Sequence, residues 1–352
     1  MNENVRKRSC GRMRILFAAA VFLAAVLGWK SPVKALAAED RRVIPCGMPI
    51  GIYMQTEGVM VIGTSQIVSQ TGQSAEPAKN VVKAGDYITA YNGEAVAEKE
   101  DLIRMVNEKG GDDAVLTVQR DGQSLDVRLK PVNTAPGEYK LGIWVRDDTQ
   151  GIGTMTYVES DGSFGALGHG ISDMDTGRLV SISDGALYQA QIRSIIKGEA
   201  GNPGSLAGVI CYGHDAVCGR IQENCGSGIF GSVTSDFLKS LPQNWVAVGD
   251  TEEIHTGEAC IRTTLDGQVR DYAVTILEMD PSGKNDNKGL LLQVTDSELL
   301  EKTGGIVQGM SGSPILQDGK LIGAVTHVLV RDSTKGYGIF IENMLEASME
   351  SR

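Results

Sequence analysis

The chain has 352 residues, 41% of them hydrophobic and 22% charged, a balance typical of a globular protein long enough for two domains. Its 44 glycines and its low aromatic content, 5%, favour tight turns over long helices. The net charge is −11, and no basic stretch lies outside the N-terminus, so nucleic-acid binding is not expected.

The first 38 residues predict a secretory signal peptide or a membrane anchor. A basic start is followed by an uncharged apolar run at 15–29 and by small residues at 35–38, which is the order found in signal peptides. The apolar run is short for a membrane-spanning helix, and both cleavage and anchoring stay open. Residues 1–37 carry seven Lys or Arg and one Glu, so the chain without them has a net charge of −17. We therefore expect an acidic, exported protein that associates with the membrane through its N-terminus.

The next segment, 41–132, predicts a small α/β domain. Residues 58–63 are apolar throughout, as in a buried strand, and 84–96 hold short strands around an Asn-Gly turn. Residues 98–110 place apolar side chains at helical spacing and end at a glycine. Residues 113–131 alternate around an Asp-Gly turn, as in a β-hairpin.

This succession of strands, helix and hairpin resembles a PDZ domain. The resemblance implies that the domain binds a peptide C-terminus or an internal strand by adding it to a sheet edge. The segment PIGIYM at 49–54 stands where that family has its carboxylate-binding loop. The resemblance thus assigns peptide binding to Ile50, Gly51, Ile52 and Tyr53. The alternative is a small domain that only packs against its neighbour.

Residues 133–140 are predicted to be a linker, and 141–352 predict a mainly β domain. Asp-Gly turn signals recur at 161, 184, 266 and 318 between short alternating segments, which is typical of a barrel or a sandwich. Two helices are expected, near 235–241 and 343–351. The absence of a Gly-x-Ser-x-Gly motif and of alternating strands and helices argues against an α/β hydrolase.

Five cysteines stand outside the N-terminal segment, an odd number that leaves at least one thiol free or paired with another chain. Cys211, Cys218 and Cys225 recur every seven residues around His214, a spacing that matches no standard zinc motif. A zinc site is conceivable, but a disulfide within 211–260 or buried free thiols are the better interpretations. We expect no metal and no cofactor.

The segment GMSGSP at 309–314 holds the candidate nucleophile. A serine that hydrolyses amides needs a base, a group that orients the base, and backbone N–H groups that hold the oxyanion. Gly309, two residues before Ser311, lets successive N–H groups face one pocket, and Gly312 keeps a Cβ away from the substrate. Ser313 has only a proline behind it and is expected to be a turn residue.

The base must be one of four histidines. His169 stands between glycines in GALGHG, where the backbone can bend closely around an imidazole, and it is the best candidate. His214 lies among the cysteines, His255 lies in an acidic polar stretch, and His327 ends a strand 16 residues after Ser311. Composition alone does not choose the orienting acid among Asp173, Asp175, Asp184 and Asp296.

A more specific resemblance rests on five ordered segments: GIWVRDDTQGIGTMTY, FGALGHGISD, IIKGEAGNPGS, TGGIVQGMSGSPI and THVLVRDSTKGYGIFIENML. Together they resemble the SpoIVB peptidase family, the stage IV sporulation protein B proteins. GMSGSP by itself is similar to the G-D-S-G-G-P loop of chymotrypsin-like proteases. The resemblance implies a chymotrypsin-like β-barrel and serine endopeptidase activity. It also implies a catalytic triad of His169, Asp296 and Ser311, with the N–H groups of Gly309 and Ser311 as oxyanion donors.

The same resemblance implies a role in endospore formation. The enzyme would be exported from the forespore to the space between the two spore membranes, where it cleaves itself and a membrane-bound inhibitor complex. That cleavage would release an intramembrane protease that activates a late mother-cell sigma factor. The PDZ domain would bind a peptide tail, its own or the target's. The alternatives are an envelope quality-control PDZ protease, which places its PDZ domain after the catalytic domain, and a non-catalytic PDZ adaptor.

Overall fold

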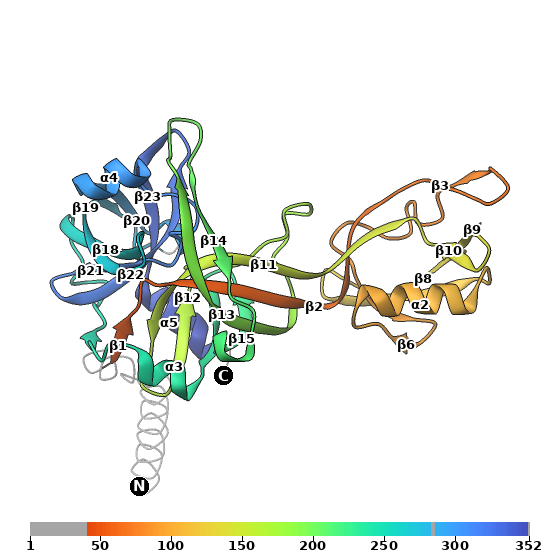
Figure 1. The fold of residues 1–352 in the computed structure, drawn as a ribbon, viewed down its shortest axis with the longest axis horizontal. Coiled ribbons are helices and arrows are strands. Elements are labelled where there is room, and N and C mark those ends of the chain that lie inside the picture. Colours follow the sequence, from red (N-terminus) through yellow and green to blue (C-terminus); the bar gives the residue numbers. More distant parts are fainter. Residues whose placement is uncertain (1–40, 283–285, 351–352) are drawn as a thin grey trace, which may run out of the picture. The chain divides into compact units, whose positions relative to one another are not determined.

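The computed structural model describes residues 41–282 and 286–350 (Figure 1), and the predicted signal or anchor at 1–38 lies outside them. The described residues form mainly strands, as predicted. No helix within these ranges is long and apolar enough to span a bilayer.

The largest sheet has 13 strands along the path β17-β1-β11-β12-β16-β15-β13-β2-β5-β7-β8, with β14 paired to β13 and β6 paired to β5. Its strands are β1 (Arg42–Pro45), β2 (Pro49–Thr64), β5 (Tyr87–Tyr91), β6 (Glu94–Ala95), β7 (Ala114–Arg120), β8 (Gln123–Leu129), β11 (Ile143–Val158), β12 (Ser163–Ala166), β13 (Ile182–Ile196), β14 (Ser205–Ile210), β15 (Val217–Cys225), β16 (Gly228–Val233) and β17 (Val246–Ala247). The two longest strands, β2 and β11, pair antiparallel along their lengths.

The two halves of β2 pack into different hydrophobic cores. Ile50 and Ile52 belong to a core that also holds residues of β11, β12, β13 and β16. Val59 and Val61 belong to a second core, built with helix α2 (Lys99–Lys109) and strands β5, β7 and β8. The chain therefore enters the second core along β2 and leaves it along β11. The part of the chain that builds this second core, called the PDZ half below, is thus an insertion between two paired strands.

This packing divides the chain differently from the predicted boundaries. The predicted PDZ segment starts at 41, whereas 42–54 pack with the strands of the C-terminal half. The predicted linker at 133–140 forms a small hairpin of β9 (Val132–Ala135) and β10 (Glu138–Lys140), and Tyr139 packs against the PDZ core. Local residue types gave no sign of the first of these pairings, because its partners in β11 and β13 lie about 100 or more residues away along the chain.

The PDZ half contains the predicted helix and hairpins. Helix α2 buries Leu102, Met105 and Val106 and ends at Gly110. Strands β7 and β8 pair in register around the Asp121-Gly122 turn, whose positive φ angles fit the right-handed twist of a two-residue hairpin. Between β2 and β5, the short strands β3 (Ile67–Val68) and β4 (Ser74–Ala75) pair with each other.

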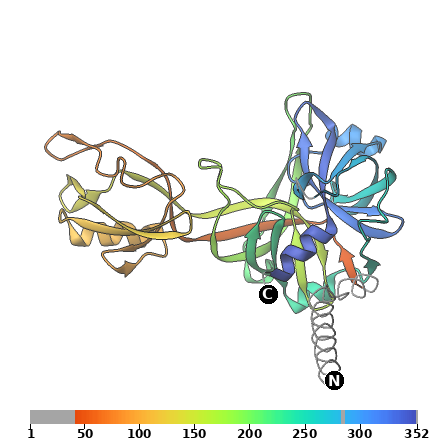
Figure 2. The ribbon, with the colours of Figure 1, turned by 180° about the vertical axis from the view of Figure 1, so that it is seen from behind.

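The C-terminal half contains a closed barrel in the order β18-β19-β20-β23-β22-β21. Its strands are β18 (Gly257–Thr264), β19 (Val269–Met279), β20 (Leu290–Val294), β21 (Pro314–Gln317), β22 (Lys320–Leu329) and β23 (Asp332–Phe340). The helices of this half are α3 (Ser235–Ser240), α4 (Ser297–Thr303) and α5 (Ile341–Glu350), with the 3-10 turns η1 (His214–Ala216) and η2 (Asp286–Lys288). Helix α5 packs against both the barrel and the large sheet (Figure 2).

Three of the four Asp-Gly turn signals connect adjacent strands, and one does not. Asp184 and Gly185 lie inside β13. There a Cβ on Gly185 would stand 2.9 Å from Ile221 Cβ and 3.2 Å from the Tyr53 carbonyl oxygen. The glycine serves close strand packing at that position, and not a turn.

Candidate active site

Ser311 lies in a tight loop that leads into β21. The loop depends on Gly309 and Gly312, whose φ angles of +98° and +95° are rarely adopted by residues with a side chain. A Cβ on Gly312 would lie 2.1 Å from the Thr154 carbonyl oxygen and 2.5 Å from the Leu167 nitrogen. The serine loop is therefore pressed against β11 and against the segment that carries His169.

His169 follows β12 at a sharp bend, where Leu167 and Gly168 both have a φ of 70°. Its Nδ1 lies 2.9 Å from the Gly170 carbonyl oxygen. A carbonyl can only accept, so the neutral ring donates from Nδ1 and keeps Nε2 free to accept a proton. Burial lowers the pKa of His169 below its usual range, so the ring is neutral at neutral pH.

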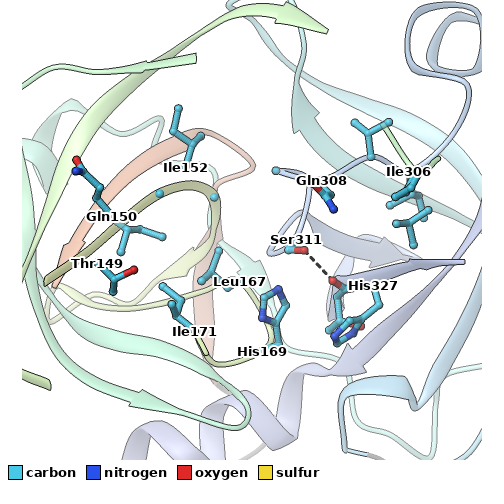
Figure 3. A pocket seen from close by; sticks show the side chains of 18 of the residues that line it. Thr149, Gln150, Ile152, Leu167, His169, Ile171, Ile306, Gln308, Ser311 and His327 are labelled. Carbon is cyan, nitrogen blue, oxygen red and sulfur yellow. Dashed lines mark hydrogen bonds between the residues drawn. The ribbon is translucent and has the colours of Figure 1, made fainter. Parts of the chain in front are cut away.

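Ser311 and His169, which are 142 residues apart in the sequence, line one cavity of about 430 Å³ (Figure 3). In this conformation the Ser311 hydroxyl donates a 2.7 Å hydrogen bond to the Thr326 carbonyl oxygen. The nucleophile must therefore rotate away from that carbonyl before it can give its proton to His169.

Two backbone N–H groups are available for an oxyanion. Gly309 and Ser311 both line the cavity, and neither of their N–H groups donates to an acceptor among the described residues. The neighbouring Met310 N–H is taken, because it donates to the Val307 carbonyl at 3.1 Å. The Gly309 carbonyl accepts a 2.8 Å hydrogen bond from the Thr154 hydroxyl, which fixes the loop from the other side.

His327 is a second histidine of the cavity; from the sequence it could approach the site, although a strand-end role was the favoured interpretation. Its ring centroid lies 5.1 Å from that of His169. Burial, and then the nearby His169 and Lys288, lower the pKa of His327 to about 4, so this ring is also neutral at neutral pH. The hairpin of β21 and β22 follows Ser311 directly and carries His327. This hairpin could have indicated, from the sequence alone, that His327 lies near the serine.

The predicted acid is not at the cavity. Asp296 is the N-cap of helix α4, where its carboxylate accepts the Leu299 N–H at 2.9 Å, and the Ala273 N–H lies 3.5 Å from its other oxygen. None of the cavity-lining residues is an Asp or a Glu. The structure thus corrects the predicted role of Asp296, because helix capping already occupies that carboxylate.

The other acidic candidates are also engaged elsewhere. Asp173 is buried and pairs with Arg146 of β11, which also binds Asp175 at 2.8 Å. Asp184 pairs with Arg220 at 2.8 Å. The group that faces His169 Nδ1 is therefore the Gly170 carbonyl.

Ser313 is fully buried, does not line the cavity and has no hydrogen-bond partner for its hydroxyl among the described residues. Its N–H donates to the Met310 carbonyl at 2.9 Å, and its carbonyl accepts from Val325 N–H at 2.9 Å. These backbone bonds hold the turn that follows Ser311, in line with the structural part expected of this residue.

A second cavity, of about 680 Å³, lies in the PDZ half between α2 and the start of β11. Leu102, Ile103 and Val106 of the helix line one side, and Ile143 to Val145 line the other. Along 143–145, β2 is the strand partner of β11 within the described part of the chain, so the other edge of β11 is open there to an added strand. Ile103 and Trp144 remain 58% and 62% exposed, which leaves apolar surface for a ligand.

The open strand edge lies at this groove and not at the predicted peptide site, Ile50 to Tyr53. Those four residues are paired to β11 on one side and to β13 on the other, and Ile50 and Ile52 are buried. A strand with both edges paired has no backbone groups for a peptide. The segment Leu141-Gly142-Ile143 has the same apolar-glycine-apolar character as PIGIYM, and it was the signal that sequence reasoning passed over.

The cysteines and His214 form no second site in the described part of the chain. No disulfide joins Cys46, Cys211, Cys218, Cys225 or Cys260. Within residues 41–282 and 286–350, no group of three or more His, Cys, Asp or Glu side chains could hold a metal ion.

Two family models match the chain. The model described as SpoIVB peptidase S55 matches residues 137–345, and a PDZ domain model matches residues 48–130. Proteins described as probable periplasmic serine endoprotease DegP-like, from Brucella suis and Brucella abortus, are 32% identical over 116 residues, which is 31% of this chain and 22% of theirs. The chain thus spans about a fifth of the length of these curated relatives.

Solved structures show lower similarity. The Rv3671c protease from M. tuberculosis in its active form is 13% identical with a TM-score of 0.31, over 58% of this chain and 74% of that one. The PDZ domain of the SdrC-like protein from Listeria monocytogenes is 24% identical with a TM-score of 0.22, over 25% of this chain and 87% of that one.

Proposed function

Because the chain belongs to the SpoIVB peptidase S55 family and is a serine endopeptidase, we propose that Ser311 is its nucleophile and His169 its general base. The observation that carries the proposal is the single cavity where Ser311, His169 and the free N–H groups of Gly309 and Ser311 meet. These are the parts that acyl transfer by a serine requires.

The reaction follows from this geometry. The Ser311 hydroxyl leaves the Thr326 carbonyl, gives its proton to His169 Nε2 and attacks the peptide carbonyl carbon. The oxygen that becomes negative accepts hydrogen bonds from Gly309 and Ser311 N–H. His169 then returns the proton to the leaving nitrogen as the C–N bond breaks. A water activated by the same histidine hydrolyses the acyl-enzyme and restores Ser311.

We assign the orientation of the base to the Gly170 carbonyl. It accepts from Nδ1 at 2.9 Å and so selects the tautomer in which Nε2 is the base. A carbonyl dipole stabilises the imidazolium less than a carboxylate does, while the neutral His327 beside it adds no repulsion from a like charge.

The PDZ half binds a peptide in the groove between α2 and β11. A strand added at Ile143 to Val145 would pair with the open edge of β11 and set apolar side chains against Leu102, Ile103 and Val106. The occupant is a peptide tail, the enzyme's own or that of its target.

The biological part of the proposal rests on the family and on the N-terminal sequence. We propose an exported enzyme of endospore formation that cleaves itself and a membrane-bound inhibitor complex, and so activates a late mother-cell sigma factor. The family description and the basic-apolar-small order of residues 1–38 support this. Envelope quality control is the second candidate, favoured by the 32% identity with the DegP-like proteins.

The test compares the purified full chain with Ser311→Ala and Ser313→Ala. A fluorophosphonate reagent should label the wild type at Ser311, and Ser311→Ala should lose both labelling and self-cleavage, by a factor on the order of 10⁶ in turnover. Ser313→Ala should keep the label. Labelling of Ser311→Ala at an undiminished rate would place the nucleophile elsewhere. A wild type that neither labels nor cleaves itself would favour the non-catalytic adaptor.

A further inference from the structure

The Ser311 cavity is without formal charge at neutral pH. Its lining, all of it from the described residues, includes no Asp, Glu, Lys or Arg side chain. Its two histidines are neutral because partial desolvation lowers the pKa of each. A charged substrate side chain that entered this cavity would lose its hydration and find no counter-ion among the lining residues.

The positions of the general base and of the oxyanion N–H groups determine how a bound peptide is oriented in the cavity. His169 must give its proton to the leaving nitrogen, so the residues after the scissile bond lie toward His169, Thr149 and Ile171 (Figure 3). The attacked carbonyl must lie at the N–H groups of the 309–311 loop. The side chain next to that carbonyl therefore enters the other side of the cavity, beside the segment 306–308 that leads into this loop.

The walls of that compartment carry no formal charge, and its apolar residues are firmly held. Ile306 and Val307 are 2% and 1% exposed and belong to the barrel core. The Ile306 N–H donates to the Ser333 carbonyl at 2.8 Å, and Ile306 Cδ1 reaches so close to Gly336 that a Cβ there would stand 2.6 Å away. Ile306 thus forms a fixed wall of the compartment, and the half-buried Val328 lines it as well.

We propose that the enzyme cleaves after residues with an uncharged, medium-sized apolar side chain, such as valine or leucine, and rejects acidic and basic residues at that position. Ile306 and Val328 are the specificity-determining residues. This inference rests on the proposed function of Ser311. An aliphatic side chain gains by leaving water in such a compartment, whereas a charged one gains nothing to offset its lost hydration.

The test uses diphenyl phosphonates, which carry a single amino-acid side chain next to the reactive phosphorus. The Ser311 oxygen forms a bond to phosphorus, one phenoxide leaves, and the serine proton goes to His169, so the product is followed by intact mass. With the full-length wild type, the valine and leucine reagents should react about 10²-fold faster than the lysine and glutamate reagents.

A matched pair of variants tests whether Val328 lines the compartment that receives the substrate side chain. Val328→Asp places a carboxylate in the compartment and should raise the rate of the lysine reagent relative to valine by about tenfold or more. Leu277→Asp adds the same charge at a 38% exposed position of β19 outside the cavity, and should leave the ranking unchanged.

The outcomes separate this inference from the proposed function. A fluorophosphonate without an amino-acid side chain reports Ser311 reactivity alone, and its failure to label Ser311 would contradict the proposed function. Labelling combined with an equally fast lysine or glutamate reagent would overturn the specificity alone. Labelling with no reaction of any phosphonate would also overturn it, because the compartment would then admit no side chain. The wild-type ranking decides the question even if Val328→Asp does not fold.

Discussion

Replacing Gly312 with alanine should disrupt the contact between the serine loop and the histidine segment. A Cβ at this position would lie 2.1 Å from the Thr154 carbonyl oxygen, 2.5 Å from the Leu167 nitrogen and 2.9 Å from the Leu167 Cα. All three are backbone atoms, so no side chain can rotate to make room. The loop would have to move by more than 1 Å relative to β11 to reach ordinary contact distances, about 3.3 Å.

The cost in free energy of unfolding has two parts. A φ of +95° costs an alanine about 1–2 kcal/mol relative to glycine. The movement also breaks the Thr154 N–H bond to the Ser311 carbonyl at 3.1 Å and the Thr156 hydroxyl bond to the Gly312 carbonyl at 2.8 Å. Each such bond contributes about 1 kcal/mol. We therefore expect Gly312→Ala to destabilise the protein by about 3–4 kcal/mol.

Gly319→Ala is the matched control, because Gly319 also has a positive φ, +77°, but a Cβ there meets nothing within 4 Å. This variant should lose only the conformational part, about 1 kcal/mol. The measurement is urea unfolding of the full-length variants, with fluorophosphonate labelling of Ser311 in parallel. If Gly312→Ala loses no more stability than Gly319→Ala and labels at the wild-type rate, the loop is not held against β11 by these contacts.

Three further predictions concern the base, the capping acid and the groove. The pKa of His169 is lowered from 6.5, and only the neutral ring accepts a proton, so the labelling rate should rise with pH through a midpoint below 6.5. A higher midpoint would contradict the partly buried, neutral base. Asp296→Asn should keep near-wild-type activity, because asparagine caps helices as well as aspartate does, whereas a triad acid would lose about 10⁴ in turnover. Ile103→Glu should weaken binding of an apolar peptide in a fluorescence titration and leave Ser311 labelling unchanged, with Leu277→Glu as the control; unaltered peptide affinity would move the binding site out of the groove.

Much of the fold could be predicted from local sequence. Alternating apolar residues and Asp-Gly turns identified hairpins such as β7–β8 and β21–β22, because strand pairing across a two-residue turn depends on neighbours in sequence. The glycines around Ser311 were also informative, since the positive φ angles of Gly309 and Gly312 leave little choice of residue.

What the sequence did not predict depends on contacts between distant residues. PIGIYM and KLGIWV have similar local character, and only their pairing shows that β13 covers the first while the edge of the second stays open. Asp296 could not be ruled out by residue type, because a carboxylate can cap a helix or orient a histidine equally well. Its position in the fold, at the start of α4, shows that this carboxylate caps the helix.

The pairing of β2 with β11 has a consequence for how this chain folds. Pro49 is paired with Thr154, more than 100 residues later, and closing so long a loop directly is slow and entropically costly. The PDZ half has its own core, and once it forms, the pair Thr64 and Ile143 is already in place. The remaining residue pairs of β2 and β11 can then form one after another, starting from that end. Loosening the PDZ core, for example with Leu116→Ala, would therefore delay the recovery of Ser311 reactivity during refolding, although Leu116 belongs to the PDZ core and does not line the active-site cavity.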